Sequence, residues 1–140
     1  MTLNKDFLRC NDLGLLLLRL SVGGLMLFHG VAKVMGGYIF IGSMLENIGL
    51  PSFLAWGAVA AELVGSIMIV LGVWTRAAAF VMVGDMVVAI LMAHMGDIFS
   101  VDPATGGWAI ELPMLYLLGS AALCFTGAGK LSITKGSVLD

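Results

Sequence analysis

The chain has 140 residues, of which 60% are hydrophobic and 11% are charged, and its formal net charge is −2. Soluble globular chains carry about 25% charged residues, so this composition excludes a soluble surface, and it also excludes a disordered chain. Seven Lys and Arg against nine Asp and Glu leave no basic patch, so nucleic acid is not expected as a partner. We therefore expect one integral membrane domain over residues 1–140, with the lipid bilayer around it.

Four apolar stretches are long enough to cross a bilayer, which takes about 20 residues in a helix. Because helices satisfy their own backbone hydrogen bonds in lipid, the predicted fold class is all-α: a four-helix transmembrane bundle with up-down-up-down topology. The predicted spans are residues 13–34, 53–73, 77–95 and 108–125. In the first outer loop, Gly36 to Pro51, apolar residues predict a short amphipathic or re-entrant helix at the membrane interface.

The ends of the spans predict the orientation. With four spans, both termini and the turn at Arg76 share one side, and the positive-inside rule places the more basic side in the cytoplasm. That side holds Lys5, Arg9, Arg76, Lys130 and Lys135, whereas the other holds Lys33 with Glu46, Asp97 and Asp102. The first apolar run lacks a cleavage site, so we interpret it as an uncleaved span. Cys10 and Cys124 form no metal-binding motif and are interpreted as free thiols.

Small residues at four-residue spacing predict close packing of the helices. Gly57, Ala61 and Gly65 form such a stripe on the second span. Gly23 and Gly24 are candidates for the same role on the first span.

Seven ionisable side chains lie within the spans or at their edges, where a charge at the helix centre costs about 2.5–3.5 kcal/mol. They are Arg19, His29, Lys33, Glu62, Asp85, His94 and Glu111. By helix rise, Arg19 and Glu62 fall at similar depth near the midplane. We predict a buried ion pair between these two residues, which either locks the first two helices together or relays protons or substrate.

A second polar level is predicted near the outer surface, where His29, Lys33, His94 and Glu111 come to similar depth. His29 and Lys33 share one helix face. Two imidazoles and a carboxylate match a two-His-one-carboxylate metal site, and the two His match axial haem ligands. The same residues match a protonatable pocket for a quinone head group, or a hydrogen-bonded cluster that only fixes helix packing.

Asp85 does not fit that level on helical geometry. It lies nine residues before His94, or about 900° along the helix, so the two side chains are expected on opposite faces. This predicts that Asp85 faces a second copy of the chain or another membrane subunit.

Four segments of the chain resemble the helices of the DoxX family in order and spacing. They are LLLLRLSVGGLMLFHGVAKVMGG, AELVGSIMIVLGVWTR, MVVAILMAHMGDIF and GGWAIELPMLYLLGSAALCFTGAGKLSI. The resemblance implies a bacterial inner-membrane protein linked to quinol oxidase, thiosulfate:quinone oxidoreductase or thiol-linked redox complexes. It places the family's polar positions on Arg19, His29, Lys33, Glu62, His94 and Glu111, and leaves Asp85 unmatched.

Three functions follow from these observations. The first is an accessory subunit of a quinone-, thiol- or sulfur-linked redox system, with a polar pocket near the outer leaflet. The second is a structural or assembly subunit with no chemistry of its own, and the third is a small transporter. No nucleophile motif, phosphate loop or dinucleotide fingerprint is present, so an oxidoreductase that acts alone is not expected.

Overall fold

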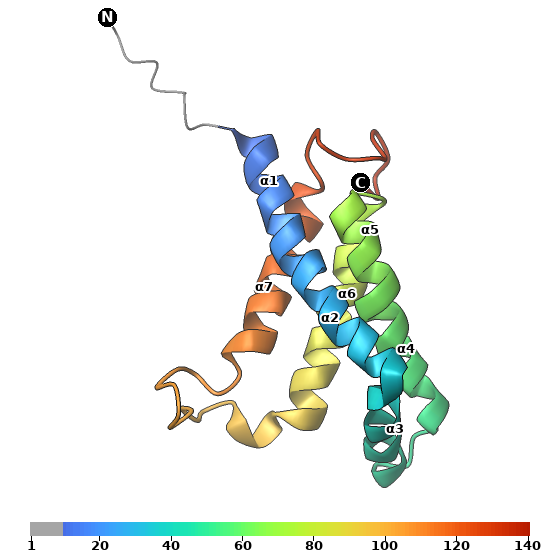
Figure 1. The fold of residues 1–140 in the computed structure, drawn as a ribbon, viewed down its shortest axis with the longest axis vertical. Helices are drawn as coiled ribbons and strands as arrows, with labels where there is room; N and C mark the ends of the chain where they lie inside the picture. The colour runs from blue at the N-terminus through green and yellow to red at the C-terminus, as the bar shows by residue number, and fades with distance from the viewer. Residues whose placement is uncertain (1–9) are drawn as a thin grey trace, which may run out of the picture.

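A computed structural model of the chain describes residues 10–140, and it folds these residues almost entirely into helices (Figure 1). The only strand-like pairing in the described part is an isolated bridge between Val101 and Trp108. The α-helices are α1 (Asn11–Arg19), α2 (Leu25–Ala32), α3 (Tyr38–Asn47), α4 (Ala55–Val59), α5 (Ser66–Leu71), α6 (Thr75–Ala93) and α7 (Glu111–Thr126). The all-α class predicted from the sequence is therefore confirmed.

Wider π-helical turns join several of these helices, and one of them contains a sharp bend. They cover Leu20–Gly24, Lys33–Gly37 and Ala60–Gly65, and a short 3-10 turn at Ser52–Leu54 precedes α4. As continuous units, Asn11–Asn47, Ser52–Leu71 and Thr75–Ala93 are each long and apolar enough to cross a membrane. The fourth apolar helix, Glu111–Thr126, is shorter. The predicted basic residues Lys5 and Arg9 lie outside the described residues.

The short helix predicted between Gly36 and Pro51 is present as α3, Tyr38–Asn47. It follows the first helix without an intervening loop, across a sharp bend at Gly36, where φ is +136°. Only glycine adopts this φ readily, so the Gly36–Gly37 pair bends the helix where the sequence suggested that it would stop. Beyond the bend, α3 lies beside α4 (Figure 1), and Gly42 is buried against Ser52.

The outer surface is apolar, unlike that of a soluble protein, and the mostly apolar interior encloses a few polar and charged side chains. Large apolar side chains are exposed on several helices, for example Phe28, Phe80, Leu115 and Phe125. The buried polar and charged residues are Arg19, Glu62, Ser66, Thr75 and Ser120. Soluble monomers rarely expose contiguous apolar patches of this kind, so the described residues have the surface of a membrane protein.

The first helix packs against α4–α5 at backbone distance. A Cβ atom on Gly23 would lie 2.8 Å from the carbonyl oxygen of Ser66, and one on Gly30 would lie 2.8 Å from the carbonyl carbon and oxygen of Glu62. Of the small residues predicted to mediate close packing, Gly23 does so, whereas Gly24 and Gly57 have open space around them. The closest contact thus comes from two glycines seven residues apart on the first helix.

Arg19 lies beyond Gly23 on the first helix, and its side chain connects α1 with α5 and with the C-terminal tail. Its guanidinium donates to the carbonyls of Ile69 (2.9 Å) and Val70 (2.7 Å) in the last turn of α5. It also donates to the carbonyls of Ala128 (3.0 Å) and Leu131 (2.6 Å) in the C-terminal tail. The last carbonyls of a helix lack intrahelical partners, so Arg19 caps α5 and fixes the tail at the same time.

The C-terminal tail lies at the same end of the molecule as the start of α1 (Figure 1). Its Leu139 carbonyl accepts the backbone N–H of Arg76 at the start of α6. Within the tail, hydrogen bonds from the Thr134 hydroxyl and the Ser137 backbone N–H hold the pKa of Asp140 below its ordinary value. The tail is therefore an ordered cap on this end of the helices.

The close approach at Gly30 leads to the first prediction. Gly30→Ala places a methyl group against backbone atoms that cannot rotate away, and overpacking of this kind costs about 1–3 kcal/mol. The free energy of unfolding, measured by SDS titration of the purified protein in mixed micelles, should fall by that amount. Gly24→Ala is the matched control, because nothing lies within 4 Å of its Cβ. Equal effects of the two variants would contradict the packing.

The second prediction concerns Arg19. Lysine keeps the charge but lacks the forked donors of the guanidinium, so Arg19→Lys should release the tail and make it accessible to trypsin at the exposed Lys130 and Lys135. Faster cleavage at these two sites should be visible by mass spectrometry. Arg76→Lys is the control, since the Arg76 side chain makes one hydrogen bond, to the Phe125 carbonyl (3.2 Å). Wild-type cleavage rates for Arg19→Lys would show that the tail is held by other contacts.

Candidate functional site: a charged pocket between the helices

A cavity of about 460 Å³ lies in the half of the molecule away from the C-terminal tail. Helix α2, the bend after it and α3–α4 form one side, and the second half of α6 with the start of α7 forms the other. Pockets for small molecules usually measure about 300–1,000 Å³. The polar side chains that line this one are His29, Lys33, Glu62, Asp85, His94 and Tyr116.

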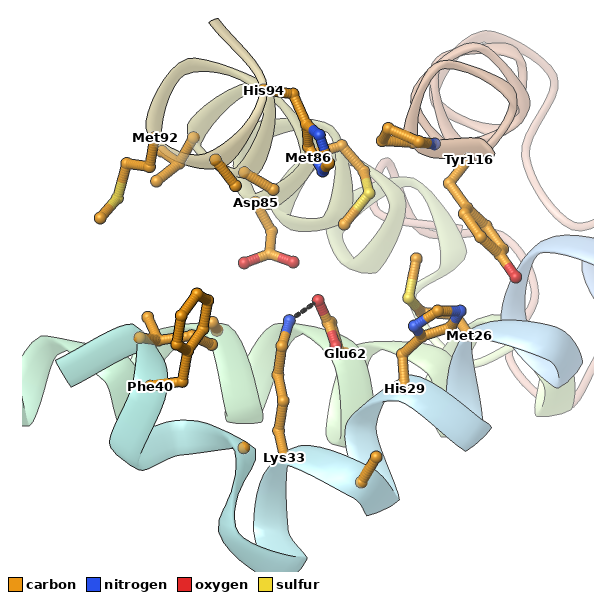
Figure 2. A pocket seen from close by; sticks show the side chains of 18 of the residues that line it. Met26, His29, Lys33, Phe40, Glu62, Asp85, Met86, Met92, His94 and Tyr116 are labelled. Atoms are coloured by element: carbon orange, nitrogen blue, oxygen red, sulfur yellow. Dashed lines mark hydrogen bonds and ion pairs between the residues drawn. The ribbon is translucent and has the colours of Figure 1, made fainter. Parts of the chain in front are cut away.

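Lys33 and Glu62 form an ion pair in the wall of this pocket (Figure 2). The side chain of Glu62 is 3% exposed and that of Lys33 is 22% exposed. Each residue belongs to a π-helical turn, a feature that is frequent at functional sites. Lys33 follows Gly30 by three residues, so the backbone contact of Gly30 with Glu62 brings the ammonium group onto the carboxylate.

Asp85 approaches this pair from α6, on the opposite wall. Figure 2 shows its carboxylate turned toward Lys33 and Glu62. One oxygen of each carboxylate, Glu62 Oε2 and Asp85 Oδ2, is buried and has no hydrogen-bond partner. With all three groups ionised the cluster has a net charge of −1, which is unfavourable in an apolar environment. The cluster therefore favours a proton, a cation or a hydrogen-bond donor.

The two histidines lie at the edges of the charged cluster. The His29 ring packs edge-to-face with Tyr116 of α7, with centroids 5.8 Å apart and an interplanar angle of 79°. His94 lies just beyond the end of α6, and its Nδ1 is 3.8 Å from Asp97 Oδ2. Both imidazoles line the cavity, so protonatable groups surround its interior on several sides.

Apolar and flexible side chains form the rest of the lining. Met26, Met44, Met86 and Met92 all contribute, together with Phe40. Methionine adapts to irregular shapes because its chain is unbranched and polarizable. The pocket thus combines a small charged cluster with adaptable apolar walls, which suits a ligand with a polar head and an apolar body.

The structure brings together three of the four residues predicted for the outer polar level. His29, Lys33 and His94 line the pocket, but Glu111 does not. Glu111 is exposed at the start of α7, where its carboxylate packs over Gly107. Glu111 was predicted at the same depth as the other three residues, but it does not join them in the pocket because its side chain points toward its own preceding loop.

The predicted ion pair between Arg19 and Glu62 is wrong. Arg19 binds four carbonyl groups, and Glu62 pairs with Lys33. The register of the two helices explains this result, because the contacts of Gly23 with Ser66 and of Gly30 with Glu62 place Arg19 beside the end of α5.

The expectation that Asp85 faces away from His94 is also wrong, since both line the pocket. Helix α6 ends at Ala93, and His94 has φ −130° and ψ 14°. The regular turn of 100° per residue therefore does not extend to His94. The observation from which a partner surface at Asp85 was inferred no longer holds.

The metal site predicted from the two histidines and Glu111 is not assembled. Among the described residues, no three His, Cys, Asp or Glu side chains come close enough together to hold a metal ion. The sequence analysis named each charged residue of the actual cluster but did not group them, because Lys33 was expected with the histidines, Glu62 with Arg19 and Asp85 at a partner surface. Tyr116, which lines the pocket and packs against His29, was not predicted.

These features define a helical membrane protein with a charged, ligand-sized pocket among its helices. The DoxX family model matches residues 14–95, and the chain belongs to this family. The chain is 34% identical over 119 residues to an "Uncharacterized protein" of Haemophilus influenzae, which covers 83% of this chain and 84% of that one. It is 33% identical over 134 residues to "Putative oxidoreductase CatD" of Bacillus subtilis, and this match covers 94% of this chain and 89% of that one. No solved structure matches the chain.

The ion pair leads to the third prediction. Lys33→Met leaves the carboxylates of Glu62 and Asp85 without a cation, and removal of one partner from a largely buried pair should cost about 2–4 kcal/mol. Glu62→Gln should cost less, because Lys33 retains Asp85 as a neighbour. The free energies of unfolding, again from SDS titration, should show this order, and the double variant should lose less than the sum of the two.

Lys130→Met serves as the control for this comparison, because Lys130 is exposed in the tail and surface substitutions usually change stability by about 0.5 kcal/mol or less. Additive losses from Lys33→Met and Glu62→Gln would contradict a direct interaction between the two side chains.

Proposed function

We propose that this protein is an accessory subunit of a membrane redox system, and that its pocket binds the head group of a quinone or a small thiol or sulfur compound. The observation that carries the proposal is the charged cluster of Lys33, Glu62 and Asp85 inside a 460 Å³ cavity with apolar walls. The name of the B. subtilis relative, which includes the word oxidoreductase, is consistent with a redox role.

The chemistry of the lining supports a redox ligand. Reduction of a quinone takes up protons, and imidazole is the side chain that exchanges protons most readily near neutral pH. His29 and His94 both line the cavity. The flexible methionine side chains would accommodate an apolar ring or tail without a fixed shape.

The orientation in the membrane is part of the same proposal. The four apolar helices would cross the bacterial inner membrane up-down-up-down, with both termini in the cytoplasm, as the distribution of Lys and Arg favours. Helix α3 would then lie near the outer interface, and the pocket would lie in the outer half of the bilayer. A ligand dissolved in the membrane would reach such a pocket directly from the bilayer.

Association with other membrane subunits also belongs to this proposal, because an accessory subunit acts as part of a larger redox system. A purely structural subunit was one alternative from the sequence, and an outward-facing Asp85 favoured it. The place of Asp85 in the pocket lining removes that support.

The fourth prediction tests ligand binding directly. Protein extracted in native lipid discs should contain a bound quinone or a small thiol or sulfur compound, which mass spectrometry of the extracted small molecules would identify. His94→Ala should reduce its occupancy about fivefold to tenfold, as expected when a hydrogen bond worth about 1 kcal/mol is lost.

Glu111→Ala is the matched control, since Glu111 lies on a neighbouring segment but outside the pocket. It should leave the occupancy unchanged. Discs of well-folded protein that contain none of these compounds above the level of the surrounding lipid would overturn the proposal.

A further inference from the structure

We propose that the charged cluster selects a ligand that donates a hydroxyl hydrogen, so that the pocket binds the reduced, hydroxyl-bearing form of a quinone-type head group more tightly than the oxidised form. This inference rests on the proposed function, which names the class of ligand but not its redox state. It follows from the atoms of the pocket that lack a hydrogen-bond partner.

The unpartnered atoms are acceptors. Glu62 Oε2 and Asp85 Oδ2 are each buried from water and receive no hydrogen bond. The other oxygen of Glu62 is already engaged by Lys33. A buried carboxylate oxygen without a donor is unfavourable by about 1–3 kcal/mol or more, so a ligand that supplies a donor at this point gains that free energy on binding.

The donors of the pocket differ from the two carboxylate oxygens. The Lys33 ammonium already donates to Glu62. His29 is exposed and the His94 side chain is 40% exposed, so neither imidazole is a buried group that lacks a partner. A ligand carbonyl can accept a hydrogen bond from these donors but gives nothing to the carboxylates, whereas a ligand hydroxyl can donate the hydrogen bond that Glu62 Oε2 and Asp85 Oδ2 lack.

The preference is largest when both carboxyl groups are ionised, because a hydroxyl then donates to one of them, whereas a carbonyl oxygen faces lone pairs with nothing to donate. A proton shared by the two groups already supplies one hydrogen bond between them. A hydroxyl can then accept that proton from one group and donate to the other, whereas a carbonyl can only accept, so the preference keeps its direction and becomes smaller.

The two carboxylates line the same cavity from opposite walls. Figure 2 shows Asp85 on α6 turned toward Glu62 and Lys33 on the opposite wall, with open space of the pocket beside them. Met26, Met86 and Phe40 line the surrounding cavity, and these side chains are suited to an aromatic ring. The hydroxyl of such a ring would point to the charged cluster.

The fifth prediction compares three probes that differ in one feature. A decyl-substituted hydroquinone, the matching benzoquinone and the hydroquinone dimethyl ether share a ring and an apolar tail, but only the first has hydroxyl groups. Their affinities for the full-length protein in lipid discs would be measured under anaerobic conditions by competition. We expect the hydroquinone to bind about tenfold to a hundredfold more tightly than the other two, the ratio given by one hydrogen bond to a charged group.

Asp85→Asn tests the origin of the preference. It replaces an acceptor oxygen with an amide nitrogen of the same shape, so the ratio between hydroquinone and benzoquinone should fall several-fold. Glu46→Gln is the control, because Glu46 is an exposed carboxylate on α3 that does not line the pocket, and it should leave the ratio unchanged. The comparison of the three probes on the unaltered protein stands even if Asp85→Asn fails to fold.

The outcomes separate the inference from the proposed function. If the benzoquinone binds as tightly as the hydroquinone, the inference is overturned while the proposed pocket stands. Equal binding of the dimethyl ether would also overturn it, because recognition would then be apolar. A decyl trimethylammonium probe that matches the hydroquinone would show that charge, and not hydrogen-bond donation, selects the ligand, and this too would overturn the inference. If no quinone-type probe binds to folded protein, the quinone form of the proposed function fails together with the inference.

Discussion

The contact between the backbones of the first helix and of α4–α5, made at Gly23 and Gly30, determines much of the remaining structure. Two contacts seven residues apart fix the rotation, the distance and the register of the two segments at once. Because a seven-residue repeat keeps one face of a helix turned to its neighbour, residues four before Gly23 and three after Gly30 lie on the same face. These residues are Arg19 and Lys33, the two basic side chains within the span.

The two cations meet different partners because the two ends of the neighbouring segment differ. Arg19 reaches the end of α5, and its planar guanidinium donates to two carbonyl groups there and to two in the C-terminal tail. Lys33 reaches a continuous helical turn, in which the backbone is already bonded, so the available acceptor is the Glu62 carboxylate. One basic residue therefore stabilises the fold, and the other forms part of the wall of a cavity.

The sequence was sufficient to predict the all-α class, the regions of the apolar helices and most of the ionisable residues that line the pocket. It was not sufficient to pair them. Depth along a helix places Arg19 and Glu62 at one level, but a change of register by two turns gives each a different partner, and register depends on contacts that depth does not include. The face of His94 was mispredicted because α6 ends at Ala93, the residue before it. A helix between Gly36 and Pro51 was predicted, but its direct connection to the first helix depends on the φ of Gly36, which the apolar pattern does not show.

Buried charged residues that have all their hydrogen-bond partners within the chain are structural, whereas those that lack partners are available to a ligand. The guanidinium of Arg19 is almost fully buried, and all three of its nitrogens donate to carbonyl groups, so its charge is dispersed over fixed dipoles. A neutral pair of Lys33 and Glu62 would be similarly self-sufficient. Asp85 breaks that balance, since it adds a negative charge and leaves two carboxylate oxygens without donors. A third charge of this kind weakens the fold in lipid, so its presence beside an open cavity is best explained by a partner that arrives from outside the chain and supplies the missing donor.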